Sequence, residues 1–315
     1  MISMPGTAAQ TIATRASLDS IGINLILGGF PKCATTSLAS WINDSSHVTV
    51  SNPKETYCLC PEIQPERDGS PWSLRECFPL HRSKWMVEAS TLNVYSRSLR
   101  DAVAADDETK VILSVRDPAE AVISWHNQMI QAGIATSIDF ETCWEESLRL
   151  DQRWDSRADD PITFRRNYLR MFSFGYWVQH WIDAIGHQRV LILRTEQMRS
   201  DPSGVRAQLD RFLGPLALSE LPPRLNQFAS IRCESFYKQL RESRLNLAFR
   251  QFEMRFPAMG TIRRAVKEQV FRKPQKKTIS SETGIQLGTH FVKDQVLMDS
   301  LWAENQRHWS SVVAD

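Results

Sequence analysis

Apolar residues gather in four short runs along the first two thirds of the chain, with polar segments between them. Each run is nearly continuous and does not alternate with polar residues, which is typical of strands buried on both faces of a parallel sheet. The runs predict strands at NLILGG (24–29), KWMVEAS (84–90), KVILSVR (110–116) and RVLILR (189–194).

Helical spacing occupies the segments between these runs. After the first run, Leu38, Trp41 and Ile42 recur along one helix face. Strands that alternate with helices over residues 22–215 predict an α/β fold: a central parallel sheet flanked by helices, with a mostly helical C-terminal part. The other predicted helices span 118–131, 140–150, 168–185, 205–213 and 281–309.

The two ends of the chain differ from this core. Residues 1–20 are small and polar without periodicity, which predicts a disordered leader before a single domain over 21–315. Residues 236–277 hold 12 Lys or Arg against three acids, and their apolar residues recur at helical spacing. This basic helical insertion is either a helix pair with a solvated cationic face, or a lid or acceptor-binding element that faces an anionic ligand.

Charge and composition exclude several classes of protein. The formal net charge is only +2, although residues 236–277 alone carry +9, so the chain is not built to coat nucleic acid. No apolar run reaches the roughly 20 residues of a membrane span. The first run follows no basic segment of the signal-peptide type, so we expect a cytoplasmic protein. The six cysteines and seven histidines lack ligand spacing, which predicts free thiols and no metal.

The strongest local signal is GGFPKCATTSL (28–38), which joins the first strand to the first helix of the predicted sheet. Backbone N–H groups and hydroxyls at a helix N-terminus favour an anion such as phosphate. A Walker A loop places its Lys directly before Ser or Thr, whereas Lys32 comes three residues before Thr35. The segment is therefore an anion loop of another type, or a helix capped by its own hydroxyls.

Three motifs in this order resemble those of sulfotransferases that use 3′-phosphoadenosine 5′-phosphosulfate, among them bacterial members and the heparan-type enzymes. PKCATTSL (31–38) resembles the loop that binds the 5′-phosphosulfate group, and PKETY (53–57) is similar to a Lys-Glu motif that follows it. VILSVRDPAEAVISWH (111–126) is similar to the segment that binds the 3′-phosphate. The resemblance covers roughly residues 22–215 and implies a P-loop-like domain that binds this donor.

The resemblance also implies which residues hold the donor. Arg116 and Ser124 match the positions that bind the 3′-phosphate, and a late basic loop, with Lys276 and Lys277 among its residues, supplies a further cation. Instead of binding phosphate, Arg116 could have a purely structural role in an ion pair with Asp117 or another carboxylate. The loop residues implied in binding the 5′-phosphosulfate are Pro31, Lys32, Cys33, Ala34, Thr35, Thr36 and Ser37.

Three positions depart from the family pattern, of which one is His47, since the usual Pro does not follow it. Ala34 stands where the family more often has Gly, and its methyl group disfavours a backbone with positive φ. Ala121 replaces a common Arg, which removes one surface contact. None of these changes removes a group on which the chemistry depends.

Transfer of a sulfuryl group requires a cation at the leaving oxygen and a base for the acceptor proton. Lys32 is the candidate for the cation. Two carboxylates compete for the role of base: Glu55 in the Lys-Glu motif, and Glu88 at the end of a predicted strand, where open α/β sheets place their ligands. His126 is a third candidate, although its position on a helix is more typical of packing.

These observations predict an enzyme that sulfates a hydroxyl or amine of a small-molecule or saccharide acceptor. Two alternatives stay open. One is a phosphotransferase that uses a nucleotide, against which the missing Gly-Lys-Ser/Thr argues. The other is a non-catalytic protein that binds nucleotides or polyanions and would tolerate the loss of Lys32 and Glu55.

Overall fold

The computed structural model describes the predicted core and the C-terminal helix. Of the basic segment 236–277 it describes only 271–272, so the helices predicted there and the predicted contacts of Lys276 and Lys277 lie outside the described residues. The described residues are 8–60, 62–63, 73–80, 82–154, 160–220, 230–231, 271–272 and 281–311.

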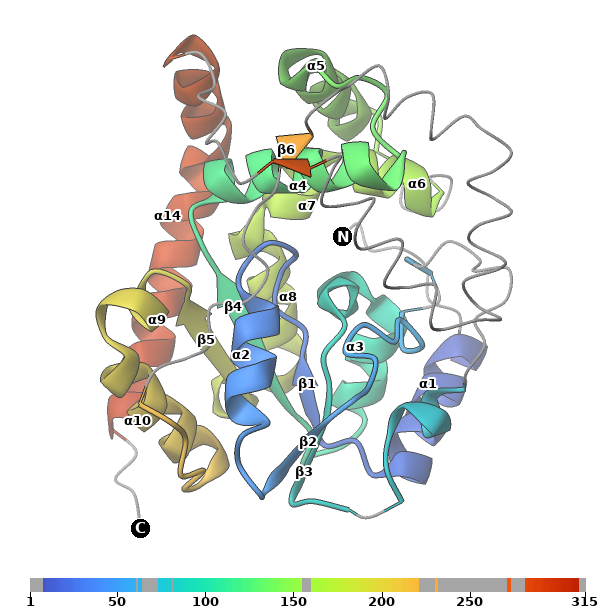
Figure 1. Cartoon of the computed structure of the whole chain (residues 1–315), viewed down its shortest axis with the longest axis vertical. Coiled ribbons are helices and arrows are strands. Elements are labelled where there is room, and N and C mark those ends of the chain that lie inside the picture. Colours follow the sequence, from blue (N-terminus) through green and yellow to red (C-terminus); the bar gives the residue numbers. More distant parts are fainter. Residues whose placement is uncertain are drawn as a thin grey trace.

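Five parallel strands form the central sheet in the order β2-β3-β1-β4-β5 (Figure 1). The four predicted strands are all present, and the predicted parallel α/β arrangement is confirmed. Strand β2 is not predicted, because the three residues VTV are too few to show a period. The strands are β1 (Leu25–Leu27), β2 (Val48–Val50), β3 (Trp85–Glu88), β4 (Lys110–Val115) and β5 (Val190–Arg194); β6 (Ser230–Ile231) and β7 (Phe271–Arg272) form a separate antiparallel pair.

Helices cover both faces of the sheet, and alternate side chains of each strand enter different cores. In β1, Leu25 and Leu27 belong to the core that α2, α9 and α10 cover, whereas Ile26 belongs to the opposite core, under α1, α3, α4 and α8. Helix α14 contributes side chains to both cores. The helices are α1 (Ala8–Ile21), α2 (Thr35–Ile42), α3 (Arg97–Ala104), α4 (Pro118–Ala132), α5 (Phe140–Gln152), α6 (Pro161–Arg166), α7 (Tyr168–Phe172), α8 (Phe174–Ile185), α9 (Gln197–Ser200), α10 (Pro202–Leu213) and α14 (Ser281–Ser311), with short 3-10 turns at Leu74–Cys77, Thr91–Tyr95 and His187–Arg189. None of the helices in the described part has the length and apolar character needed to cross a membrane.

The long helix α14 runs along the outer edge of β5 and bonds to its backbone (Figure 1). The buried Asn305 side chain accepts from the Ile192 N–H at 3.0 Å and donates to the Val190 carbonyl at 2.8 Å. The Trp309 indole N–H also donates to the Val190 carbonyl, at 3.0 Å. Side chains of a helix thus satisfy β5 groups that lack a neighbouring strand on this side.

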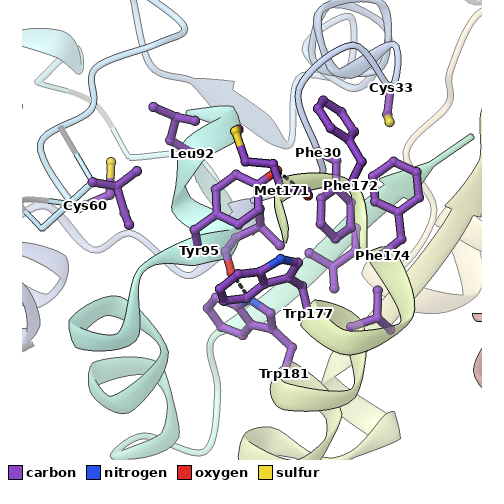
Figure 2. Packing of buried hydrophobic residues seen from close by; sticks show 14 of the residues in the cluster. Phe30, Cys33, Cys60, Leu92, Tyr95, Met171, Phe172, Phe174, Trp177 and Trp181 are labelled. Atoms are coloured by element: carbon purple, nitrogen blue, oxygen red, sulfur yellow. Dashed lines mark hydrogen bonds between the residues drawn. The ribbon is translucent and has the colours of Figure 1, made fainter. Parts of the chain in front are cut away.

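An aromatic cluster supports the loop that follows β1 (Figure 2). Phe30 is fully buried, with its ring centroid 4.4 Å from that of Phe174 and 6.0 Å from that of Tyr95. The Tyr95 hydroxyl donates to the Met171 carbonyl at 3.0 Å, and the Trp181 indole N–H donates to the Val94 carbonyl at 2.9 Å. These bonds satisfy the polar ends of large buried rings, so the loop rests on a well-defined surface.

The predicted disordered leader over 1–20 is wrong for residues 8–20, which belong to helix α1. Thr14, Leu18 and Ile21 are buried on one face of α1, which packs against α3. Arg15 also pairs with Asp106, just after α3. Small residues between these anchors hide the helical period in the sequence, and tertiary packing supplies the stability that the local sequence lacks.

The single helix predicted over 168–185 is two helices, α7 and α8, which meet at Ser173. Asp294 of α14 explains the break. Its carboxylate accepts from the N–H groups of Gly175 and Tyr176 at 2.9 Å each, in the first turn of α8. A Cβ on Gly175 would lie 2.6 Å from the Asp294 carbonyl oxygen, so only glycine permits this approach. The apolar period continues through both helices and therefore does not reveal the break.

Replacement of Leu18 by Ala tests the docking of α1. Because this side chain is only 1% exposed, Leu18→Ala should lower the free energy of unfolding by about 3 kcal/mol, measured by urea denaturation. Ile12→Ala is the matched control on the same helix, since Ile12 is 70% exposed, and it should change stability by less than about 0.5 kcal/mol. Equal effects of the two variants would contradict the packing described for α1.

Candidate active site

The loop after β1 is held against the end of β4 by close backbone contact. A Cβ on Gly29 would lie 2.2 Å from the backbone nitrogen of Ser114, so this position requires glycine. The Phe30 N–H donates to the Ser114 carbonyl at 3.3 Å, and the Ser114 hydroxyl donates to the Cys33 carbonyl at 2.8 Å. Cys33 is itself fully buried, and burial raises the pKa of its thiol. The loop is thus fixed from both sides by one residue of β4.

The backbone of the loop turns through two residues with positive φ. Lys32 has φ 68°, and Ala34 has φ 56° and ψ 19°, in the left-handed region. The methyl group of Ala34 disfavours the conformation that the loop nevertheless adopts, at a cost of roughly 1 kcal/mol relative to glycine. The departure from Gly at this position therefore places strain directly before α2.

The hydroxyls of the loop lie within α2 and do not precede it. Ala34 is the N-cap residue of α2 and forms no side-chain cap, while Thr35 is the first helical residue and is buried. The alternative of a helix capped by its own hydroxyls therefore does not fit. The N-terminus of α2 instead points its dipole toward the loop, as anion loops do.

Arg116 follows β4 and contacts the loop directly. Its Nη1 donates to the Lys32 carbonyl at 3.1 Å, and its Nη2 donates to Glu120 one helical turn further along α4. The ion pair expected as an alternative exists, but it involves Glu120; Asp117 instead caps α4 by accepting from the Glu120 N–H at 2.8 Å. In the described part of the chain the buried Nε–H of Arg116 has no hydrogen-bond partner.

Helix α4 brings a residue to Lys32 that the sequence analysis missed. Lys32 Nζ donates to Oε1 of Gln128 at 3.1 Å. Gln128 lies four residues after Ser124, which is itself half-buried, so both occupy one face of α4. The i, i+4 spacing from Ser124 is the signal that could have identified Gln128. Burial, and next the nearby charge of Arg116, lower the pKa of Lys32.

A third cation, Lys54, joins the loop to Glu55. Lys54 Nζ contacts Thr35 Oγ1 at 3.4 Å, the Ala89 carbonyl at 2.7 Å and Glu55 Oε1 at 2.5 Å. Glu55 Oε2 accepts from the Thr91 N–H at 2.8 Å. Lys54 is therefore part of the site, although its sequence position is equally compatible with a solvated side chain.

The two candidate bases differ sharply in exposure. The Glu55 side chain is 30% exposed, whereas Glu88 is fully enclosed. Glu88 accepts from the hydroxyls of Thr56 at 2.6 Å and Ser90 at 2.5 Å, from the Ser90 N–H at 3.1 Å and from the Asn93 amide. Burial outweighs these bonds and raises the pKa of Glu88.

The third candidate, His126, is a packing residue. It is 2% exposed, and its two ring nitrogens lie 3.2 Å from the Tyr168 hydroxyl and 3.2 Å from the Ile138 carbonyl. Both nitrogens are thus occupied by neighbours within the fold. In the described ranges no group of three or more His, Cys, Asp or Glu could hold a metal ion.

A cavity of about 510 Å³ lies beside Arg116, between the ends of β4 and β5 and the helix α14. Arg194 and Glu196 line it with Arg116, and the sequence analysis missed both, because they follow a strand without a recognisable motif. Apolar side chains of α14, among them Phe291 and Met298, form another wall. Arg116 thus contacts the loop and also lines a cavity whose walls are partly charged and partly apolar.

Comparison with known proteins identifies the class to which this site belongs. The sequence matches the family model of the sulfotransferase domain over residues 24–246, so the chain belongs to the sulfotransferase family. Its structure resembles that of a sulfotransferase from Alicyclobacillus acidocaldarius, with a TM-score of 0.51 and 18% identity over 65% of this chain and 86% of that chain. This likeness shows a shared fold. No curated protein matches the sequence significantly.

Replacement of Ala34 by Gly tests the strain in the loop. Glycine adopts positive φ without cost, so Ala34→Gly should raise the free energy of unfolding by about 0.5–1 kcal/mol in urea denaturation. The control is Ala39→Gly within the same helix, which should lower stability by about 1 kcal/mol or more, because glycine is unfavourable inside a helix. Destabilisation by both variants would show that the left-handed turn at Ala34 carries no strain.

Proposed function

We propose that this chain transfers a sulfuryl group from 3′-phosphoadenosine 5′-phosphosulfate to a hydroxyl or amine of a small-molecule or saccharide acceptor. The observation that carries the proposal is the meeting of two cations at one anion loop. Arg116 donates to the carbonyl of Lys32, and Lys32 Nζ donates to Gln128 of α4. A donor with phosphate groups on both the 3′ and 5′ oxygens of its ribose is suited to two such cations in fixed relation.

The residues present fit this donor. The enclosed Nε–H of Arg116 lacks a partner in the described ranges, and a phosphate oxygen is the acceptor that a guanidinium best accommodates. Arg116 and Ser124 would hold the 3′-phosphate. Residues 31–37 would hold the 5′-phosphosulfate at the N-terminus of α2, and the cavity beside Arg116 offers space for the nucleoside. Contacts from Lys276 and Lys277 remain predictions.

Lys32 is the cation that would stabilise the leaving oxygen. Its pKa is lowered mainly by burial, which means that the surroundings solvate its charge poorly. A poorly solvated cation gains most when negative charge develops beside it, so it favours the transition state over the ground state. The bound donor supplies the reactive sulfuryl group; Lys32 supplies only charge and position.

Glu55 is the base that we propose for the acceptor proton. A base must contact the acceptor, and Glu55 is partly exposed whereas Glu88 is enclosed and accepts four hydrogen bonds. Lys54 and the Thr91 N–H each hold one oxygen of Glu55 and so fix its orientation. Glu88 has a supporting role, because it binds Thr56 and Ser90. Thr56 follows Glu55 directly, and Ser90 precedes Thr91, whose N–H donates to Glu55.

Binding of the spent donor, 3′-phosphoadenosine 5′-phosphate, tests the proposal. At 100 times its Kd, the bisphosphate should stabilise the protein by about 2.7 kcal/mol and raise Tm by roughly 5 °C. ATP with magnesium at the same concentration should leave Tm within about 1 °C, because the loop lacks the Walker A arrangement. Stabilisation by ATP-magnesium alone would instead favour a phosphotransferase. Stabilisation by the bisphosphate without consumption of 3′-phosphoadenosine 5′-phosphosulfate would favour a binding protein.

Two substitutions test the assignment of the catalytic residues in a donor-consumption assay with a pool of acceptors. Lys32→Ala should lower the rate by about 100- to 1,000-fold. Lys293→Ala, which removes an exposed lysine of α14, is the control and should leave the rate within about twofold. Glu55→Gln should lower the rate by about 100-fold or more while bisphosphate binding is retained. Full activity of Glu55→Gln would show that another group is the base.

A further inference from the structure

One face of α4 contacts both Lys32 and Arg116. Glu120, Ser124 and Gln128 follow one another at intervals of four residues, so they lie along the same side of the helix. We call these three residues the α4 face. At one end Glu120 accepts from Arg116, and at the other Gln128 accepts from Lys32. Each cation proposed to bind the donor therefore already has a partner on this face.

The partner at Arg116 occupies a particular edge of the guanidinium. Nη1 is used by the Lys32 carbonyl, Nη2 by Glu120, and the buried Nε–H has no partner among the described residues. Nε and Nη2 form the side edge of a guanidinium, which can bind two oxygens of one phosphate. Glu120 already accepts from Nη2, one of the two nitrogens of this edge. A phosphate that uses both nitrogens would bring its negative charge beside the Glu120 carboxylate, so the two anions compete for the same edge.

We propose that Glu120 is a built-in competitor of the donor's 3′-phosphate for Arg116. This inference rests on the proposed function and extends it to a residue that determines nucleotide affinity without being catalytic. In the free protein Glu120 balances the charge of Arg116; on binding, the 3′-phosphate takes its place. Because the spent donor keeps its 3′-phosphate, the same competition promotes release of the product.

The Glu120–Arg116 pair has the exposure that exchange requires. The Glu120 side chain is 51% exposed, so water can solvate its carboxylate once it leaves, whereas Arg116 is 15% exposed and keeps its place through the Lys32 carbonyl. An i, i+4 ion pair whose carboxylate is half exposed contributes little to folding. The opposite end of the α4 face uses the neutral Gln128, which holds Lys32 without adding a negative charge beside the loop.

Isothermal titration calorimetry of Glu120→Gln tests the proposal with two ligands. Removal of the competing carboxylate should tighten binding of 3′-phosphoadenosine 5′-phosphate by about three- to tenfold. Binding of adenosine 5′-phosphate, which lacks the 3′-phosphate, should change by less than about twofold. Glu145→Gln removes the same charge from an exposed position of α5, and this control should leave both affinities unchanged within about twofold.

A merely structural role for Glu120 gives a different result. Glu120 lies in the first turn of α4, where an acidic residue also interacts favourably with the helix dipole. Loss of that interaction alone would lower Tm and leave the ratio of the two affinities unchanged. Weaker binding of the bisphosphate by Glu120→Gln, or equal tightening of both ligands, would likewise overturn the proposal.

A second background separates competition for Arg116 from direct repulsion of the ligand. In an Arg116→Gln variant, Glu120→Gln should no longer tighten bisphosphate binding, because the contested guanidinium is absent. A gain that persists in this background would overturn the proposed competition. If the unmodified protein binds no bisphosphate, the proposed function fails and this inference fails with it; if it binds bisphosphate and Glu120→Gln gives no gain, only the inference fails.

Discussion

The site depends on one close backbone contact, that of Gly29 with Ser114. No side chain fits between Gly29 and the end of β4, since a Cβ on Gly29 would lie 2.2 Å from the backbone nitrogen of Ser114. The contact continues the pairing of β1 with β4 beyond Leu27 and Ile112. It fixes where the loop begins to turn, and it also fixes where Arg116 emerges, two residues after Ser114. The relative position of the two cations thus follows from strand register and owes little to the flexible side chains themselves.

The three cations around the loop, Lys32, Lys54 and Arg116, differ in how far their charges are neutralised by neighbouring side chains. Lys32 has a neutral amide as its partner, whereas Lys54 pairs with Glu55 and Arg116 pairs with Glu120. The Nε–H of Arg116 has no partner in the described part. Buried cations with weak partners are costly in an empty site. Lys32 is then available to an anionic ligand without rearrangement of the backbone, because hydrogen bonds with Ser114 of β4 and the aromatic cluster under Phe30 already hold the loop.

The sequence predicts the parts of this structure that depend on continuous local patterns. Four strands and the helix that begins at Pro118 are visible because their apolar residues form runs or periods. The anion loop is visible because Lys32 is followed closely by three hydroxyl residues, Thr35, Thr36 and Ser37. Helix α1 and the break between α7 and α8 depend on contacts with distant segments, which no local period records. Gln128 and Glu120 escape notice for a related reason: they act through helix-face neighbours whose importance appears only once Lys32 and Arg116 are placed beside α4.

The Asn305 contacts also bear on how the protein avoids self-association. Strand β5 lies at the end of the sheet, and an uncovered edge of this kind is a template on which another chain can add a strand. Asn305 and Trp309 occupy backbone groups of β5 that such a strand would use. Helix α14 therefore protects the fold against aggregation. A chain shortened before Asn305 would expose the backbone groups of β5 to pairing with another chain, even if its active site were intact.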